Sequence, residues 1–270
     1  MLAEALASIR AQTFTDYEII VVSNGESAEM RRASAAAAAG CVYLALDKGS
    51  LPLARNAGVA TARGDWIAFL DDDDLWLPEK LRRQLAAAEA TGADLVACDS
   101  VQFFPDGSEV HDRVRKPDGW SYSRAINHHR WWAIPSTIIV RKRALDERGG
   151  FNLLLKAHED TDMWRRVAWR HSIHQMDEAQ TRYRRGHPSI MANARRSLFY
   201  DIVHFAQMQW DTPRDLRHEL PTFTGFALPR LIKLYGPKFM LDLLHYTKPR
   251  TRLMQLRRRI ASITAIWLPR

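Results

Sequence analysis

The sequence has little cysteine and no long apolar run. Its two cysteines, Cys41 and Cys98, each lie in an apolar stretch of the 270-residue chain. This usage predicts two buried free thiols, with a bridge between them as the alternative. No run of about 18 apolar residues occurs, so we expect no membrane-spanning helix. Residues 1–10 lack the apolar core of a signal peptide, and we therefore expect a cytoplasmic protein.

Several short motifs are also missing. The chain has no Gly-x-Gly-x-x-Gly sequence and no Gly-Lys-Ser/Thr loop, which argues against a dinucleotide-binding site and a P-loop. The lack of a Gly-x-Ser-x-Gly elbow argues against an α/β-hydrolase. His128 and His129 have no further Cys or His at zinc-binding spacing, so we interpret them as part of a loop or pocket wall.

Positive charge is concentrated at one end. The formal net charge is +8, but residues 225–270 hold ten Lys or Arg against one acid, Asp242, and residues 1–224 together carry −1. The nearly neutral body argues against a nucleic-acid-binding protein. The tail mixes apolar and basic residues, as helices on anionic membranes do, so we expect it to dock on the inner face of a membrane. A solvated tail or a dimer contact is the alternative.

Hydrophobic patterns alternate between helix and strand along the first two thirds of the chain. We expect helices over residues 2–12, 27–39, 52–62, 78–91 and 160–170, and strands over residues 17–22, 41–46, 66–70, 94–98, 136–140 and 173–176. A hairpin is expected around Pro105-Asp106-Gly107. This order predicts an α/β fold with a mostly parallel, Rossmann-like sheet covered by helices on both faces. We place one domain over residues 1–188 and a basic, helical C-terminal extension over residues 189–270.

Four consecutive acids, Asp71 to Asp74, directly follow the apolar strand at residues 66–70. Asp71 and Asp73 point the same way in an extended segment, and Mg²⁺ is commonly held by one or two carboxylates together with substrate phosphates. Ligands of open α/β sheets bind at the carboxyl ends of the strands. The sequence therefore predicts a cation site here. The alternative is a solvated turn in which Asp74 helps to cap the helix opened by Pro78.

Two further groups are less informative taken alone. Glu159 and Asp160 open a helix, where the helix dipole also favours acids. Arg55 lies on an expected helix and has the geometry to reach a diphosphate, but surface arginines are common on such helices.

Together these segments resemble glycosyltransferase family 2. The similar blocks are Ala11-Gln12-Thr13-Phe14, the strand at residues 17–22, Leu53 to Gly58, Gly64 to Leu81, Gly149-Gly150-Phe151 and Glu159 to Arg166. They occur in the family's order over residues 2–190, and the blocks around Asp71 and Asp160 are specific in combination.

The resemblance implies a GT-A fold and a metal-dependent, inverting transfer from a nucleotide sugar, a UDP-sugar, to a hydroxyl of a glycan or lipid-linked acceptor in cell-surface glycan synthesis. It implies that Asp71 and Asp73 bind Mg²⁺ or Mn²⁺, with His187 as a further ligand. Asp160, paired with Glu159, would be the general base. The donor would lie against Asn24, Arg55, Asp71 and Asp72.

Two departures from the family pattern affect the donor side. The family usually begins with a strand before the first helix, whereas this sequence starts at that helix, so either the start lies upstream or the sheet has a gap. Ser23 and Asn24 stand where two acids are usual. A catalytically decayed sugar-nucleotide-binding module is therefore the alternative function. A nucleotidyltransferase is less favoured, because no glycine-rich basic loop accompanies the first strand.

Overall fold

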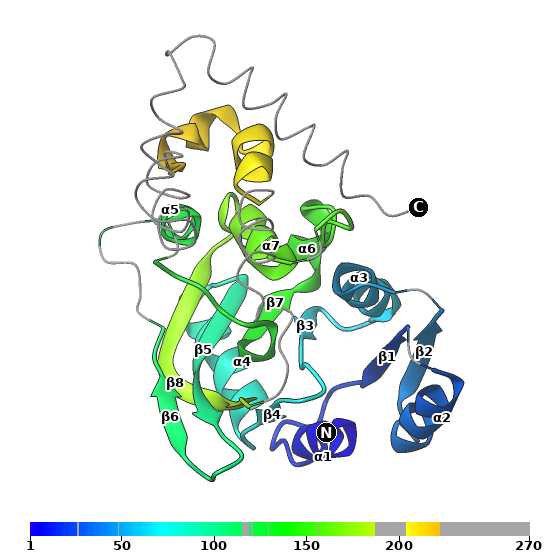
Figure 1. Cartoon of the computed structure of the whole chain (residues 1–270). Coiled ribbons are helices and arrows are strands. Elements are labelled where there is room, and N and C mark those ends of the chain that lie inside the picture. Colours follow the sequence, from blue (N-terminus) through cyan, green and yellow to red (C-terminus); the bar gives the residue numbers. More distant parts are fainter. Residues whose placement is uncertain are drawn as a thin grey trace, which may run out of the picture. The chain divides into compact units, whose positions relative to one another are not determined.

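The computed structural model describes residues 1–25, 27–47, 49–114, 119, 121–128, 130–155, 157–186 and 204–221, and the fold follows the predicted alternation of helices and strands (Figure 1). The helices are α1 (Leu2–Arg10), α2 (Ala28–Ala37), α3 (Leu51–Thr61), α4 (Lys80–Thr91), α5 (Tyr122–Asn127), α6 (Lys142–Glu147) and α7 (Glu159–Ala168). The strands are β1 (Ile20–Asn24), β2 (Val42–Leu46), β3 (Trp66–Ala68), β4 (Leu75–Trp76), β5 (Leu95–Phe103), β6 (Glu109–Asp112), β7 (Ile138–Arg141) and β8 (Ile173–Arg184). Short 3₁₀ helices cover Pro135–Thr137 and Arg214–Glu219, and residues 204–211 are helical.

Local signals account for most element ends. Ser27 caps α2 by accepting a hydrogen bond from Met30 N at 3.2 Å, and Gly92 ends α4 with a φ of 66°. Several predicted bounds differ from the structure, and two of the differences have a clear cause. Helix α4 begins at Lys80 after an N-cap at Glu79, so Pro78 lies before the helix. Strand β8 continues past Met176 to Arg184, because β5 offers it a partner over its whole length.

A mixed six-stranded sheet in the order β3-β7-β5-β8-β4, with β6 paired to β5, forms the centre. Strand β7 is antiparallel to both β3 and β5, and β5 is parallel to β8. Strands β3, β5 and β8 therefore share one direction. The predicted hairpin is present, since Phe103 pairs with Glu109 across the turn.

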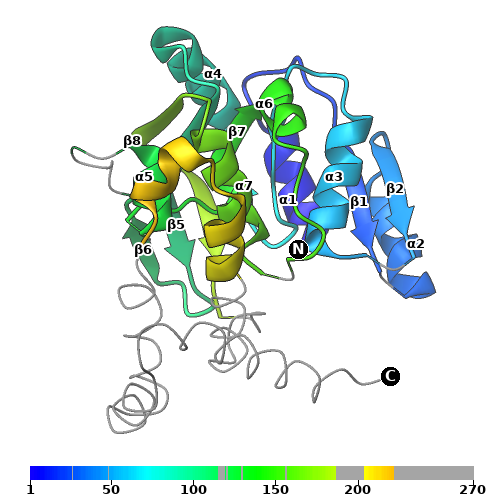
Figure 2. The ribbon, with the colours of Figure 1, turned by 90° about the horizontal axis from the view of Figure 1, so that it is seen from above.

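Both faces of this sheet are buried, as predicted. Leu95 and Ala97 of β5 pack into a cluster with α5, α6 and α7, whereas Val96 between them packs with α4 on the opposite face. Alternate side chains of a strand point to opposite faces, and full burial of three consecutive residues therefore requires two covering layers. Figure 2 shows these layers from above.

Other expectations about the body can be checked in the same residues. Cys41 and Cys98 are both free thiols, as predicted, with Cys98 buried and Cys41 partly exposed. None of the helices in the described ranges has the length and hydrophobicity needed to cross a lipid bilayer. The basic segment 225–270 and His187 lie outside the described residues.

The sheet is interrupted between β1 and β3. Within the described part of the chain, β1 pairs in parallel with β2 alone, and β3 pairs with β7 alone. A cavity of about 1440 Å³ separates them, lined by apolar side chains of β1 and β3 and walled by α1 and α3. Figure 1 shows β1 and β2 set apart from the larger sheet. The gap therefore lies at the place where the family resemblance implies a further strand.

We predict that this cavity accepts an added strand. Between β1 and β2, Val42 N donates to Ile19 O and Gly25 N donates to Leu46 O. Because successive amides of a strand point to opposite sides, the amides of Ile20 and Val22 point away from β2 and face the cavity. Fusing about six β-branched residues and a short linker ahead of Met1 should slow hydrogen exchange at these amides and raise the melting temperature.

The control for this prediction is a segment of equal length with proline at alternate positions, which removes the donors of a strand. Equal exchange rates and melting temperatures for the two fusions would show that the cavity does not take a strand.

A buried lysine supports the opposite face of the sheet. The ammonium group of Lys80 donates to Gln84 Oε1 at 2.6 Å and lies 4.4 Å from the centre of the Trp76 ring. Burial lowers the pKa of Lys80 to about 8. Because the unfolded chain keeps this proton up to the ordinary lysine pKa of 10.5, the Lys80 contribution to stability falls as the pH drops towards 8.

We predict that replacing Lys80 by Met removes this pH dependence. In the native protein, the free energy of unfolding should rise with pH between pH 8 and 10.5, and Lys80 should contribute up to about 1.4 kcal/mol per pH unit to this rise. Urea unfolding at several pH values in that interval measures the difference between the native chain and Lys80→Met. Parallel curves for the two proteins would contradict the prediction.

Candidate functional site

Arg55 joins two carboxylates that are far apart in the sequence. Helix α3 carries Arg55 towards the sheet, where Nη1 donates to Glu159 Oε1 at 2.6 Å and Nη2 donates to Asp71 Oδ1 at 3.3 Å. The guanidinium also lies 5.6 Å from the centre of the Phe151 ring. Asp71, which follows β3, and Glu159, the first residue of α7, thus contact the same guanidinium group from two sides.

The charges of this group shift one another. Burial opposes the charged form of Arg55, but the carboxylates of Asp71, Asp160 and Glu159 together raise its pKa. Burial and the neighbouring charge of Asp160 raise the pKa of Glu159, and Arg55 acts against this rise. The cluster has more acids than bases and is therefore suited to receive added positive charge.

The turn after β3 presents its acids to the cavity. Asp71, Asp72 and Asp73 line the large cavity between β1 and β3, together with Arg55 and Asn24. The side chain of Asp71 is 42% exposed, so it is accessible despite its contact with Arg55. The structure therefore gathers all the residues predicted for the donor around one hollow.

Asn24 stands at the end of β1 on the same cavity. Its Oδ1 atom is buried and has no hydrogen-bond partner among the described residues. A Cβ atom at position 49 would lie 1.5 Å from this oxygen, so a side chain there would force the Asn24 amide to move. A buried acceptor without a partner is costly, and a ligand N–H donor would satisfy it.

The predicted base lies in the first turn of α7. Asp160 Oδ1 accepts hydrogen bonds from Thr161 N at 2.6 Å and Thr161 Oγ1 at 3.3 Å. No partner for Asp160 Oδ2 occurs in the described ranges, while Glu159 is committed to Arg55. His158, just before the helix, has a φ of 60°, the one positive φ outside glycine among the described residues. Backbone strain of this kind clusters at functional sites.

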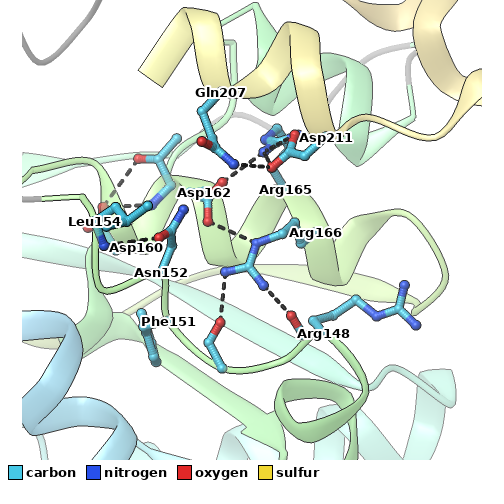
Figure 3. A network of polar contacts seen from close by, with 12 residues as sticks. Arg148, Phe151, Asn152, Leu154, Asp160, Asp162, Arg165, Arg166, Gln207 and Asp211 are labelled. Carbon is cyan, nitrogen blue, oxygen red and sulfur yellow. Dashed lines mark hydrogen bonds and ion pairs between the residues drawn. The ribbon is translucent and has the colours of Figure 1, made fainter. Parts of the chain in front are cut away.

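Buried charges hold α7 in place (Figure 3). Asp162 is fully buried and accepts from Arg165 at 2.7 Å and from Arg166 at 2.8 Å. Arg165 also bonds Asp211 at 3.0 Å in the helical segment 204–211, and Arg166 donates to Gly150 O at 2.8 Å. Helix α7, which carries Asp160, is thereby tied to two other segments.

The loop before α7 is tied to α3 as well. The side chain of Asn56 donates to Phe151 O at 2.8 Å and accepts from Phe151 N at 2.7 Å. Phe151 packs edge-on against Phe69 and Trp164. These contacts fix the position of Arg55 relative to α7, because Asn56 is its neighbour on the same helix.

The carboxylates in the turn after β3 are ligands of the kind that divalent cations such as Mg²⁺ prefer. Asp71 and Asp73 provide hard oxygen ligands, and a Mg²⁺ site of this type takes its remaining ligands from phosphate and water. Arg55 already places a positive group beside Asp71. Within the described residues, no group of three or more His, Cys, Asp or Glu side chains is arranged to hold a metal by itself.

Sequence reasoning missed some contacts and misplaced one residue. Asp74 does not cap the helix after Pro78. It is fully buried and bonds Ser136, because β8 and the 3₁₀ helix fold over this turn. The adjacent residues Trp131 and Trp132 also differ, since Trp131 lies in the core and Trp132 is exposed. The role of Ser136 had no signal in the sequence. Asn56 and Phe151 lie in blocks similar to the family, but the contact between them was not predicted.

Solved structures of other proteins show which fold this chain has. TarS residues 1–349 from S. aureus in complex with UDP-GlcNAc match with a TM-score of 0.62 at 17% identity, over 86% of this chain and 69% of TarS. The mannosyltransferase PcManGT from Pyrobaculum calidifontis, in complex with GDP-Man and Mn²⁺, matches with a TM-score of 0.57 at 16% identity, over 96% of this chain and 76% of PcManGT. The fold is that of the GT-A glycosyltransferases, as predicted.

Sequence comparison gives the family. The family model described as "Glycosyl transferase family 2" matches residues 1–149, and the chain belongs to this family. The succinoglycan biosynthesis protein ExoO of Rhizobium meliloti is 40% identical over 97 residues, 35% of this chain and 28% of ExoO. The chain spans less than two thirds of the length of the first curated relatives that it matches.

We predict that Arg55→Met destabilises the protein, because it leaves the buried Glu159 carboxylate without its cation. The loss should be about 3 kcal/mol in the free energy of unfolding, measured by urea denaturation. Adding Glu159→Gln should restore part of this loss. The matched control is Arg63→Met, since the side chain of Arg63 is 82% exposed beside Glu18 and should cost less than about 1 kcal/mol. Equal losses for the two arginines would contradict the role assigned to Arg55.

Proposed function

We propose that this chain forms the donor-binding and catalytic part of a metal-dependent, inverting glycosyltransferase. It would transfer a sugar from a nucleoside-diphosphate sugar to a hydroxyl group. The observation that carries the proposal is the double contact of Arg55, which sets the acids of the β3 turn opposite those of α7. A reaction that needs a cation for a leaving diphosphate and a base for an incoming alcohol requires two such groups.

The donor would lie along the cavity between Asn24 and the β3 turn. Asn24 Oδ1 is an acceptor without a partner in the described residues and is suited to an N–H of a nucleobase. Asp72 and the guanidinium of Arg55 border the same cavity and would contact the donor. TarS in complex with UDP-GlcNAc supports a UDP-sugar as the first donor to test.

Asp71 and Asp73 would hold the cation, Mg²⁺ or Mn²⁺, and His187 remains a proposed further ligand. The bound cation would neutralise charge that develops on the leaving diphosphate. PcManGT was solved with GDP-Man and Mn²⁺, which supports a cation in a fold of this type. Arg55 would stabilise the same charge from the other side of Asp71.

Asp160 would act as the general base, with Glu159 holding Arg55 in position. The acceptor hydroxyl gives its proton to Asp160 while the hydroxyl oxygen forms a bond to the anomeric carbon of the donor sugar. The bond from that carbon to the diphosphate oxygen breaks in the same displacement, and the configuration inverts. Asp160 fits this role better than Glu159, because Glu159 Oε1 already accepts from Arg55 at 2.6 Å.

The acceptor and the site of action are further proposals. ExoO is named for succinoglycan biosynthesis, which supports a glycan or lipid-linked acceptor in cell-surface polysaccharide synthesis. The basic segment 225–270 would hold the protein on the inner face of an anionic membrane. Liposome flotation of the full chain and of a chain ending at residue 224 tests this second point, and equal flotation would refute it.

A sugar-nucleotide-binding module without turnover is the second candidate. Ser23 and Asn24 in place of two acids and the interrupted sheet both favour it. Calorimetry that detects donor binding in a protein without transferase or hydrolase activity would support this candidate. Robust turnover would eliminate it.

We predict distinct effects for the two groups of acids. Asp73→Asn should abolish Mn²⁺-dependent binding of UDP, measured by calorimetry. Asp160→Asn should leave that binding within about twofold and lower turnover by at least 10²-fold, because only the base is lost. Asp65→Asn, at the opposite end of the same cavity, is the matched control and should change neither. The proposed enzymatic activity would be refuted if a chain that includes its full amino terminus released no nucleoside diphosphate from any of a panel of donors.

A further inference from the structure

Asp74 is a buried carboxylate that the proposed mechanism does not use. It is the last of the four consecutive acids and is fully buried, whereas Asp71, Asp72 and Asp73 line the cavity. Burial raises the pKa of Asp74 to about 7. A carboxyl group placed in such surroundings needs partners in the protein to offset the loss of water.

Both oxygens of Asp74 have partners from distant segments. Oδ2 accepts a hydrogen bond from Ser136 Oγ at 2.6 Å, and Oδ1 accepts one from Arg184 N at 3.0 Å. Ser136 belongs to the 3₁₀ helix before β7, and Arg184 ends β8. Asp74 therefore joins the acidic turn to strand β8 and to the 3₁₀ helix that precedes β7.

The hydroxyl of Ser136 continues the chain of bonds back to the site. While it donates to Asp74, it accepts from Asp71 N at 3.1 Å. Within the turn, Asp74 N donates to Asp71 O at 3.1 Å. Arg184 Nε donates to Asp73 O at 2.8 Å. The backbone of the turn is thus held at Asp71, at Asp73 and at Asp74.

The turn needs such support because its acids repel one another. Like charges on neighbouring residues favour an open conformation, and the side chains of Asp71 and Asp73 must stay directed at one place to share a cation. The bonds through Ser136 and Arg184 fix the backbone from the buried side and leave the two carboxylates directed at the cavity.

We propose that Asp74 is a positioning residue that, through Ser136, fixes the Asp71–Asp73 turn in the geometry that binds the cation and the donor diphosphate. This inference rests on the proposed donor site. It assigns a role to Asp74 and Ser136 that neither their sequence position nor the family resemblance indicates.

The test compares Asp74→Asn, Ser136→Ala and the double variant with the native chain. An amide at position 74 cannot accept from both Ser136 Oγ and Arg184 N, and alanine at position 136 removes the bridging hydroxyl. We expect each single variant to bind Mn²⁺ with UDP about tenfold more weakly in calorimetry, the size of one charge-assisted hydrogen bond. The double variant should lose little more, because both changes break the same chain of bonds.

The matched control is Thr181→Val. The hydroxyl of Thr181 is buried and donates to the carbonyl of Ser136 at 2.9 Å, so its loss affects the same residue without touching the bonds to Asp71 and Asp74. Thr181→Val should lower the melting temperature about as much as Ser136→Ala but leave the affinity for Mn²⁺ and UDP unchanged. If Thr181→Val lost as much affinity as the variants at positions 74 and 136, their loss would reflect general destabilisation, and the proposal would be overturned.

Hydrogen exchange separates this proposal from the proposed function. In the absence of any ligand, the Asp71 amide should exchange faster in Ser136→Ala and Asp74→Asn than in the native chain, and not in Thr181→Val. Unchanged exchange would overturn the positioning role whatever the protein binds. If the native chain bound neither Mn²⁺ nor any nucleotide, the donor site would be refuted, and with it the purpose assigned to Asp74, even where the exchange pattern is as expected.

Discussion

The arrangement of the site depends on one guanidinium group. Arg55 contacts Asp71 in the turn after β3 and Glu159 in α7. No strand pairing joins these two parts of the chain to each other. Without a cation between them these carboxylates would repel across the cleft, and the cost would rise with burial. Arg55 is itself placed by α3, whose next residue, Asn56, bonds the backbone of Phe151 in both directions. These polar contacts tie α7 to α3, in addition to the packing of α7 in the hydrophobic core.

The gap beside β3 places a second constraint on the donor side. The parallel pair of β1 and β2 is joined to the larger sheet by helices and loops, with no strand between them in the described residues. Two strands alone are marginally stable, so β1 depends on its packing against α3. Asn24 ends β1, and its place along the cavity therefore depends on the same helix that carries Arg55. In the proposed function, α3 would therefore couple donor recognition at Asn24 to charge neutralisation at Arg55.

Sequence patterns predicted those features that a few neighbouring residues decide. The cap at Ser27, the helix end at Gly92 and the turn before β6 all follow from local chemistry, and the apolar runs located the core strands. Features decided by distant partners were missed. Strand β8 extends because β5 pairs with it, and Asp74 is buried because β8 and Ser136 cover it. The prediction that Asp73 and Asp160 serve one site came from family resemblance, since no local pattern can relate residues 87 positions apart.

The acids of this site also show that position in the fold, rather than residue type, decides the chemistry. Asp74 and Asp162 are both fully buried, yet Asp162 is balanced by two arginines whereas Asp74 has a hydroxyl and a backbone amide as its partners. Burial raises the pKa of Asp74, and the hydrogen bonds from Ser136 and Arg184 act against this rise. Both oxygens of the anchoring carboxylate of Asp74 are occupied by the protein. Asp71, by contrast, is 42% exposed beside Arg55 and borders the cavity together with Asp73, and Asp160 accepts its described hydrogen bonds through Oδ1.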